Sequence, residues 1–443
     1  MPESILQRCQ KVSTEPPNEI TGAKAGMNEA KRQIAGLWWM PTNPQEKWVG
    51  LLTLEYDKGP LLVLTVPKGH DFTPPKIGEI IHGCDQHGKP VTLLNPAENE
   101  SSSSTALTFI KYSAGAVILG LELPTRNAFL VNCIEINLQH FYEWAGITGF
   151  VTKPGSTTNE VSIAHSLPEL RSFQIDHDLT VEIGTSFVFH NGSKEKSLTE
   201  DTFVQFKSRK GLGFSECKTL VHAMRSLLHF GVLSPVYPLR IECKKIGFGQ
   251  TLGETYIPNK IEIWWSLNRK SVSSEHRDRW VFRFSDVEKD FGQFMRNWLA
   301  FLKKFDEALG CYFTTVYHAL TSPVQNICLA QALEAFHATK HPSKGKVFFN
   351  DRVRSLVKNQ WVPLKEFVKD PETFSKQVTD NRNHFTHHGS KSAQRALSGA
   401  NLIRLNERMQ LLFQMCILTE MGIPAARFPR LRRQLAQHII EYS

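Results

Sequence analysis

Cysteine is scarce in this 443-residue sequence, and no two cysteines are closely spaced. The eight cysteines are spread from Cys9 to Cys416 without any Cys-x-x-Cys motif. This spacing argues against a cysteine zinc site and against a disulfide framework. It is typical of buried thiols in a reducing compartment.

Long hydrophobic runs are also missing. The N-terminal stretch MPESILQRCQKVSTEPPNE lacks the apolar segment of a secretory signal. The most apolar run, residues 114–124, is too short to cross a bilayer and contains a glutamate. We therefore expect a cytoplasmic protein with no membrane partner.

The whole chain has a formal net charge of +9, and acidic residues are outnumbered in only one part of it. Residues 291–443 hold 21 Lys and Arg against 11 Asp and Glu, whereas residues 1–290 hold 31 against 32. The excess of positive charge therefore lies in the last third. One explanation is an acidic partner, most often a nucleic acid. The other is a basic, solvated surface without a ligand.

The length predicts two or three domains, and residues 1–290 are predicted to form a strand-rich one. Two β-type runs flank the turn Asp57-Lys58-Gly59 within residues 48–66. Residues 95–104 include a serine run that indicates a mobile loop, and one amphipathic helix is expected at about 215–230. Further strands are expected at 127–138, 172–183, 185–193, 239–248, 259–267 and 278–286.

Residues 291–443 are predicted to form an all-α bundle of four or five helices, so the expected fold class is α+β. Apolar residues recur every three or four positions from Phe294 to Leu309, in one helical stripe. The segment 322–338 is apolar nearly all round, which predicts a central helix. Others are expected at 351–361, from about Pro371 onward, and along a leucine-rich seam from Leu402 to Cys416.

The stretch DNRNHFTHHG, residues 380–389, combines arginine, asparagine and three histidines. Arg382 and His387 form the pattern Arg-x-x-x-x-His, and Asn383 follows the arginine directly. This pattern alone is not specific, because the basic C-terminal tail contains a second pair. The first pair is favoured by its basic, helical setting and by a seam that fixes the helix register. The second pair is Arg433 and His438, and the seam consists of Phe374, Val378 and Phe385.

The helical period separates the two candidate groups. At about 100° per residue, Arg382 projects near the seam and His387 lies roughly 140° further round. Asn383 and His387 share a face. Arg382 and His387 can therefore line one pocket only where the helix starts late, bends or meets a partner.

These residue types suit RNA cleavage. Attack by a ribose 2′-hydroxyl requires a base that titrates near neutrality, as histidine does. A guanidinium can contact two phosphate oxygens at once, and asparagine can orient the hydroxyl or the phosphate. No metal or other cofactor is required. Because one histidine cannot easily act as both base and acid, we expect two copies of the site to face each other across a homodimer.

Two other interpretations of the stretch remain open. It is an exposed polar helix start, or it is a zinc site in which His384, His387 and His388 are ligands at helical spacing. The zinc interpretation is weaker, because no glutamate stands between the histidines as in His-Glu-x-x-His and no cysteine is near. In the nuclease interpretation, His384 and His388 are solvated or phosphate-touching neighbours.

Further candidates lie on the preceding helix and in the strand-rich region. Glu334 and His337 are three apart; either Glu334 orients a catalytic side chain in the same cleft, or the two are buried polar groups paired with neighbours. The pairs Trp38-Trp39 and Trp264-Trp265 fit base stacking, but tryptophans beside strands are more often core residues.

The hexad RNHFTH, preceded by LAQALEAFHA and DRVRSLV and followed by a helix ending LLFQMCILTEMGIP, resembles the HEPN ribonuclease fold. It is most similar to the HEPN domain of ApeA-type anti-phage defence proteins. The motif there reads Arg-Asn-x-x-x-His, and Arg382, Asn383 and His387 match it position by position. AGLWWMPTNPQEKWVGLLTLEYDKGPLLVLTV and HAMRSLLHFGVLSPV resemble the N-terminal domain of that family.

This resemblance implies a strand-rich sensor or regulatory domain over residues 1–290 and a HEPN nuclease domain over residues 291–443. It implies a dimeric, metal-independent endoribonuclease that is held inactive and released during phage infection by a phage-derived trigger. RNA is the expected partner, and transfer RNA is attractive because single-stranded loops expose a reachable 2′-hydroxyl. The alternative is a HEPN protein that binds RNA or a toxin without cleaving anything.

Overall fold

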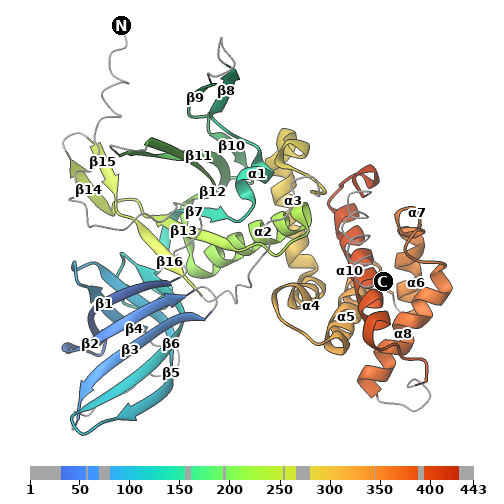
Figure 1. Cartoon of the computed structure of the whole chain (residues 1–443), viewed down its shortest axis with the longest axis horizontal. Helices are drawn as coiled ribbons and strands as arrows, with labels where there is room; N and C mark the ends of the chain where they lie inside the picture. The colour runs from blue at the N-terminus through green and yellow to red at the C-terminus, as the bar shows by residue number, and fades with distance from the viewer. Residues whose placement is uncertain are drawn as a thin grey trace.

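The structure is a computed structural model, and it describes residues 31–55, 58–68, 80–154, 161–192, 196–252, 255–265, 280–343, 345–387 and 394–428. A strand-rich region is followed by a helical one (Figure 1), which confirms the expected α+β class. Three residues named in the predictions, Asp57, His388 and Cys9, lie outside the described residues, as does the pair Arg433 and His438.

Six antiparallel strands close into a small barrel, because β6 pairs with both β3 and β5. Side chains alternate between its interior and its surface, as the period of a strand requires. Trp38 and Leu52 belong to the barrel core and are 1% and 0% exposed. The strands are β1 (Lys31–Met40), β2 (Asn43–Glu55), β3 (Gly59–Pro67), β4 (Ile80–Asp85), β5 (Pro90–Ser103) and β6 (Leu107–Leu119).

An open antiparallel sheet continues from the barrel through the pairing of β6 with β16. Its order is β16 (Ile261–Trp264), β13 (Pro238–Lys244), β7 (Leu130–Leu138), β12 (Lys196–Gly213), β11 (Leu179–Asn191) and β10 (Arg171–Gln174). Two short hairpins accompany it, β8 (Phe150–Pro154) with β9 (Val161–His165), and β14 (Gly249–Leu252) with β15 (Thr255–Pro258). The helices α1 (Phe141–Ala145) and α2 (Phe214–Val232) contact β12.

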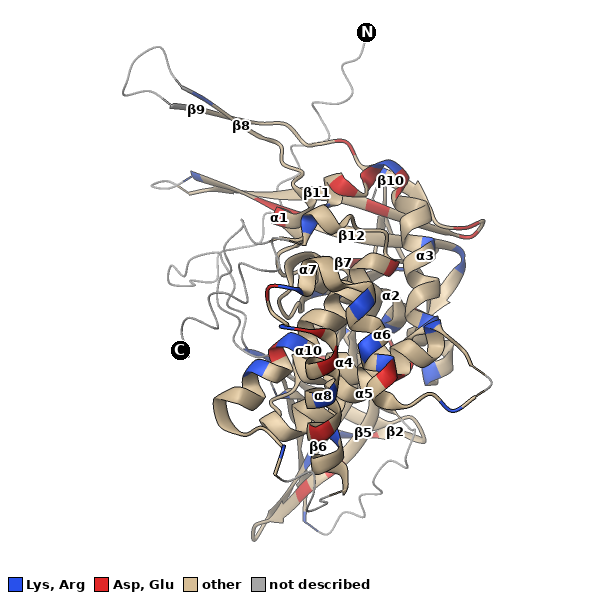
Figure 2. Cartoon of the chain, turned by 90° about the vertical axis from the view of Figure 1, so that its right-hand side faces the viewer, with Lys and Arg blue, Asp and Glu red and all other residues tan. Residues whose placement is uncertain are grey.

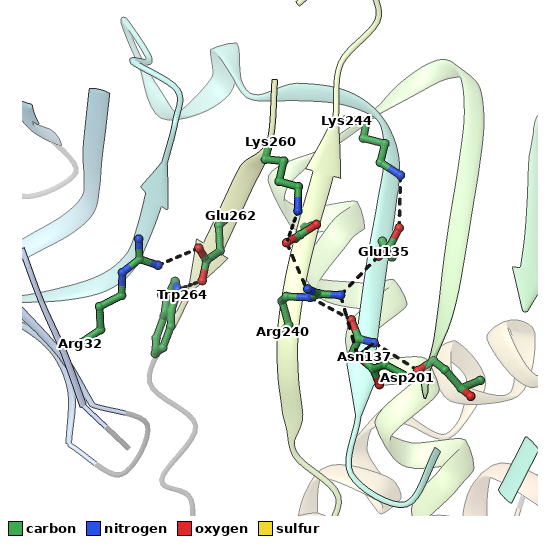
Figure 3. A network of polar contacts seen from close by, with 11 residues as sticks. Arg32, Glu135, Asn137, Asp201, Arg240, Lys244, Lys260, Glu262 and Trp264 are labelled. Carbon is green, nitrogen blue, oxygen red and sulfur yellow. Dashed lines mark hydrogen bonds and ion pairs between the residues drawn. The ribbon is translucent and has the colours of Figure 1, made fainter. Parts of the chain in front are cut away.

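The two faces of the open sheet differ in polarity. On β7, Ile134 and Ile136 enter the core that α2 covers, while Glu135 and Asn137 point to the other face. Figure 3 shows the charged network on that other face, where Arg240 of β13 lies among acidic side chains of neighbouring strands. Because strands alternate strictly, one face of the sheet packs against helices and the other carries cross-strand ion pairs.

The helical region is organised around a central helix, α5 (Ser322–Lys340), which contacts four other helices. These are α4 (Asp306–Tyr317), α6 (Phe349–Asn359), α8 (Pro371–His387) and α10 (Gly399–Glu420). The first helix, α3 (Phe291–Lys304), packs against α2, and the short α7 (Trp361–Leu364) follows α6. The bundle and its central helix were both expected from the apolar periodicity.

One hydrophobic core joins the strand-rich and helical regions without a break near residue 290. Trp298 of α3 donates a hydrogen bond from Nε1 to the carbonyl oxygen of Ala223 in α2, at 2.9 Å. Phe230 of α2 stacks on Tyr312 of α4, with 5.7 Å between ring centroids. The helices that follow residue 290 are therefore held against the strand-rich region by direct packing.

Several local predictions were wrong. Residues 95–103 are strand rather than loop, because β5 and β6 form a long hairpin in which Glu100 and Lys111 pair at 2.6 Å. Residues 280–286 form no strand; their aromatic side chains are buried instead in a cluster with Trp144. The stripe from Phe294 to Leu309 is divided between two helices that meet at Phe305.

Three of the four paired tryptophans are core residues, which confirms the core interpretation for them: Trp38, Trp264 and Trp265 are buried, and Trp39 is half-buried. The seven cysteines in the described parts of the chain are all free thiols. None of the helices among the described residues has the length and apolar character needed to cross a membrane.

Candidate active site

Helix α8 carries the motif residues and is anchored at its start. Pro371 begins the helix, and Asp370 precedes it as a cap whose Oδ1 accepts a hydrogen bond from the Thr373 backbone N–H at 2.8 Å. This hydrogen bond lowers the pKa of Asp370. Phe374 and Val378 face the core as predicted. The register of α8, and with it the direction of each motif residue, is therefore set by capping and packing.

Arg382 is held at the edge of the core by contacts from three elements. Its Nη2 donates to Oε2 of Glu334 in α5 at 3.2 Å, and its Nη1 lies 3.4 Å from Oδ1 of Asn383. The guanidinium carbon stands 5.1 Å from the ring centroid of Phe349, at the start of α6. These contacts fix the plane of the guanidinium while 29% of the side chain remains exposed.

The exposed part of Arg382 faces a shallow cavity of about 450 Å³ between α6 and α8. Asn383 lines the same cavity, together with Phe348, Asn350 and Thr379. A second cavity of about 460 Å³ adjoins it and shares Asn350 and Thr379. Its lining adds Arg354, Glu372, Thr373 and Lys376. We refer to these two adjoining cavities, which lie along α6 and α8, together as the groove.

His387 lies apart from this cavity. It is the last residue of α8, it is exposed, and it is not among the residues that line the cavity. The backbone is α-helical from Pro371 to His387, and the Thr386 hydroxyl donates to the Arg382 carbonyl at 2.7 Å. Within one chain Arg382 and His387 therefore project in different directions, as the helical period predicts.

Glu334 and His337 have different surroundings although both lie on α5. Glu334 forms an ion pair with Arg382, so these two candidate side chains are in direct contact. His337 is 7% exposed and accepts a hydrogen bond at Nδ1 from Nη1 of Arg352, at 3.4 Å. Desolvation by burial, with repulsion from His341 and Arg352, lowers the pKa of His337 to about 4. His337 is therefore neutral near pH 7 and belongs to the packing between α5 and α6.

Two residues that the sequence did not single out complete the surroundings of the motif. Phe349 lies beneath the guanidinium of Arg382. Asn381 is fully buried; its Nδ2 donates to the Gln377 carbonyl, and its Oδ1 accepts from the Leu397 backbone N–H, both at 2.8 Å. Asn381 thus ties the chain before α10 back to α8. The sequence did contain a signal for Asn381, because this residue occupies a position on the apolar seam of α8. A polar group that is buried there must be hydrogen-bonded.

The histidines do not form a metal site in the part of the chain that the structure describes. No group of three His, Cys, Asp or Glu side chains there could hold a metal ion. His384 is half-buried beside Phe385, with 5.1 Å between ring centroids, whereas His387 is exposed. His388, the third zinc ligand considered, lies outside the described residues.

The charge around the groove is mixed rather than uniformly basic. Figure 2 shows lysines and arginines interspersed with acidic residues on the helices of this region. Arg354 pairs with Glu372 at 2.6 Å and with Asp351 at 3.2 Å, whereas Lys376 has no ion-pair partner among the described residues. Part of the predicted basic excess, including Arg430, Arg432 and Arg433, lies outside the described residues.

Comparison with known proteins gives two family matches. The model described as ApeA N-terminal domain 1 matches residues 33–298, and the model described as Apea-like HEPN matches residues 327–427. The second match contains α6, α8 and α10, and with them every motif residue of the site. No curated protein and no solved structure gives a significant match.

Proposed function

Because the chain belongs to the ApeA family and carries an Apea-like HEPN domain, we propose that it is an anti-phage endoribonuclease that needs no metal. The observation that carries this proposal is the setting of Arg382. Its guanidinium is fixed by Glu334 and Phe349, and its exposed part opens on a cavity that Asn383 also lines. Membership of the family supports a nuclease-type defence protein, and this geometry supports a phosphate-binding role for Arg382.

The guanidinium of Arg382 has donors left for a ligand. It carries five N–H groups, of which Glu334 and Asn383 engage two. The others can bind two oxygens of one phosphate, and such charge-assisted bonds strengthen as negative charge builds up in the transition state. The amide nitrogen of Asn383 is a further donor at the same cavity.

In the proposed reaction, His387 removes the proton of a ribose 2′-hydroxyl. The bond from O2′ to phosphorus forms, and the bond from phosphorus to O5′ breaks. The products are a 2′,3′-cyclic phosphate and a 5′-hydroxyl. A second, protonated imidazole gives its proton to the departing O5′, so the protons balance without a metal ion or a water molecule.

Two chains are required for this arrangement. Within one chain Arg382 and His387 diverge, and one His387 cannot be base and acid in the same step. A homodimer through the HEPN domain would bring Arg382 of one chain near His387 of the other and would supply both imidazoles. The proposed substrate is RNA, with a transfer RNA loop as the first choice because its 2′-hydroxyls are accessible. The strand-rich domain is proposed to restrain the nuclease until it senses a phage-derived trigger.

The test is cleavage of total RNA by the purified full-length chain in the presence of EDTA. The unaltered chain is expected to produce fragments with 2′,3′-cyclic phosphate ends, and His387→Ala is expected to produce none. His438→Ala, in the second Arg-x-x-x-x-His pair, is the matched control and should cleave normally. Activity that requires added metal, or that persists in His387→Ala, would contradict the proposal.

A second function is favoured by one observation: the Arg382 guanidinium is already paired with Glu334. In this alternative the HEPN domain binds RNA or a toxin without cleaving RNA. Binding of RNA by the unaltered chain, with no cyclic phosphate product at any protein concentration, would support it.

A further inference from the structure

A second candidate site is a cavity that shares no lining residue with the motif cavity and lies between the strand-rich region and the first helices of the bundle. Its volume is about 1250 Å³. One wall is formed by α2, by the bend at residues 176–178 with the start of β11, and by the end of β12. The other wall is formed by the end of α3 and the start of α4, which face α2 in Figure 1. The cavity therefore spans the contact between the two regions.

The floor of this cavity is apolar. Buried side chains line it from both regions, and they include two aromatic rings, Trp265 and Phe313. The edge of the His222 ring meets Phe313, with 5.7 Å between centroids. His222 is reached by solvent, yet the surrounding protein and Arg225 lower its pKa, which favours a neutral imidazole. The aliphatic members of the floor are Leu212, Leu220, Val221, Leu302 and Leu309.

The rim of the cavity carries lysines that have no carboxylate partner. Lys210, Lys218 and Lys303 are exposed, and no described carboxylate forms an ion pair with any of them. Lys210 Nζ lies 3.4 Å from Nε2 of His177, and its charge contributes to the lowered pKa of Asp178 without a direct ion pair. Three ammonium groups around one hollow repel each other unless an anion lies among them.

The acidic residues of the rim are engaged elsewhere. The Asp178 carboxylate accepts hydrogen bonds from the Ser208 hydroxyl and from the backbone of Arg209 and Lys210. Asp176 accepts from the backbone of its own turn, and Glu216 caps α2 through the Gly213 N–H at 2.6 Å. Asp306 lies in the first turn of α4, where the helix dipole stabilises its charge. These carboxylates keep their charge but are fixed by the turn and by the helix starts, whereas the rim lysines have N–H donors available to an anion.

We propose that this cavity binds a small organic anion that has an aromatic part, with a nucleotide as the chemical class. The aromatic part lies on the apolar floor near Phe313, and the phosphates reach Lys210, Lys218 and Lys303. Apolar floors with a few convergent polar groups are typical of small-molecule sites, although the usual volume is about 300–1,000 Å³. A cavity of about 1250 Å³ thus has room for a nucleotide and bound water.

The position of the site gives such a ligand a structural consequence. Lys303 and Asp306 flank the break between α3 and α4 at Phe305, so a bound ligand contacts this junction and α2 together. Phe313 follows Tyr312, whose hydroxyl lies 2.8 Å from Nε2 of His229 in α2 and 2.8 Å from Nε2 of Gln414 in α10. A nucleotide in the cavity therefore stabilises the contact between the strand-rich and helical regions.

Binding is tested by isothermal titration of the full-length chain with ATP, AMP and inorganic triphosphate. We expect ATP to bind, and we expect the charge-reversed variant Lys218→Glu/Lys303→Glu to bind ATP at least tenfold more weakly. Lys153→Glu, at an exposed lysine on β8, is the matched control and should bind ATP as the unaltered chain does. Thermal melting of each variant checks that the fold is retained.

Three outcomes would overturn the proposal: no heat of binding with ATP or AMP at millimolar concentration, equal affinity for ATP and inorganic triphosphate, or equal affinity of the charge-reversed variant and the control. Arg382→Ala separates this site from the nuclease site. If ATP binding were lost in Arg382→Ala and kept in Lys218→Glu/Lys303→Glu, the nucleotide would be bound at the motif instead. The binding measurement does not depend on RNA cleavage, so the two proposals can fail independently.

Discussion

The strand-rich and helical regions surround an arginine in different ways. On the outer face of the open sheet, Arg240 lies 3.6 to 3.9 Å from three carboxylates, those of Glu135, Asp201 and Glu242 (Figure 3). Arg382 meets one carboxylate, that of Glu334, and its exposed part faces an open cavity. An arginine surrounded by acids contributes to the sheet, whereas an arginine with donors left over is available to a ligand.

One histidine from each region shows the same difference between a structural side chain and one that is available to a ligand. His229 is buried and both ring nitrogens are engaged: Nδ1 donates to the Ser234 carbonyl at 2.9 Å, and Nε2 accepts from the Tyr312 hydroxyl. Burial lowers the pKa of His229 to about 4, so it stays neutral at pH 7. His387 is exposed at the end of α8. A proton-transfer group must reach its substrate, and only the exposed histidine can do so.

The largest expected effect is on the rate of RNA cleavage, which should fall when Arg382 is replaced and not when Arg240 is replaced. Arg382→Ala is expected to lower the rate of RNA cleavage on the order of 10²–10⁴-fold, because it removes the group proposed to bind the phosphate. Its melting temperature should change little, since a partly exposed ion pair contributes about 0–1 kcal/mol. Arg240→Ala should show the reverse pattern, with full activity and a lower melting temperature. Equal losses of activity in both variants would contradict the comparison.

Acid should destabilise both regions, through one buried histidine in each. The pKa values of His229 and His337 are lowered to about 4, from the ordinary value of 6.5. Below pH 6.5 the unfolded chain binds protons that the folded chain does not, so stability that is complete above pH 6.5 is lost toward pH 4. For His229 the slope approaches about 1.4 kcal/mol per pH unit.

Urea unfolding at several pH values between 7 and 4 measures this slope. His229→Gln and His337→Gln should each flatten it, and His190→Gln, at an exposed position on β11, should leave it unchanged. An identical slope in all four proteins would show that neither buried histidine is responsible.

A smaller effect is expected where the two regions meet. Tyr312→Phe removes a hydroxyl that joins His229 and Gln414, and it leaves buried polar groups unpaired. The free energy of unfolding should fall by about 1–3 kcal/mol. Tyr256→Phe, at an exposed tyrosine of β15, is the control and should unfold like the original chain. Equal stability of both variants would show that the hydroxyl does not join the regions.

The smallest effect concerns the carboxylate that orients Arg382. Glu334→Gln keeps the shape of the side chain and removes its charge, so the guanidinium is held less firmly but remains in place. We expect roughly a tenfold loss of cleavage rate, or about 1.4 kcal/mol, with little change in stability. Glu307→Gln, at an exposed glutamate of α4, serves as the control. An unchanged rate in Glu334→Gln would assign this ion pair to packing alone.

Much of the architecture could be predicted, because periodicity is a local property. The central position of α5 follows from a segment that is apolar on nearly every side, and the seam of α8 follows from Phe374 and Val378. The failures have tertiary causes. The serine-rich end of β5 is a strand because β6 offers it hydrogen bonds, and residues 280–286 are not a strand because their aromatic rings find a buried cluster around Trp144.

The candidate site was predictable to the same extent. The motif residues and Glu334 could be proposed from residue types and spacing, but the contact of Phe349 with Arg382 and the buried role of Asn381 could not. His337 was grouped with Glu334 because the two are three apart. The structure separates them, since Arg352 of α6 approaches one and Arg382 of α8 approaches the other.

The sequence by itself determined the chemistry available to this protein: a guanidinium, an amide and an imidazole within six positions of one helix, in a basic helical segment behind a strand-rich one. Only the tertiary structure decided which of these groups share a cavity, which carboxylate holds Arg382, and where strands close into a barrel. The reason is physical. Residue types and helical angles are properties of a short segment, whereas the Arg382–Glu334 contact joins residues 48 positions apart and exists only once α5, α6 and α8 have packed.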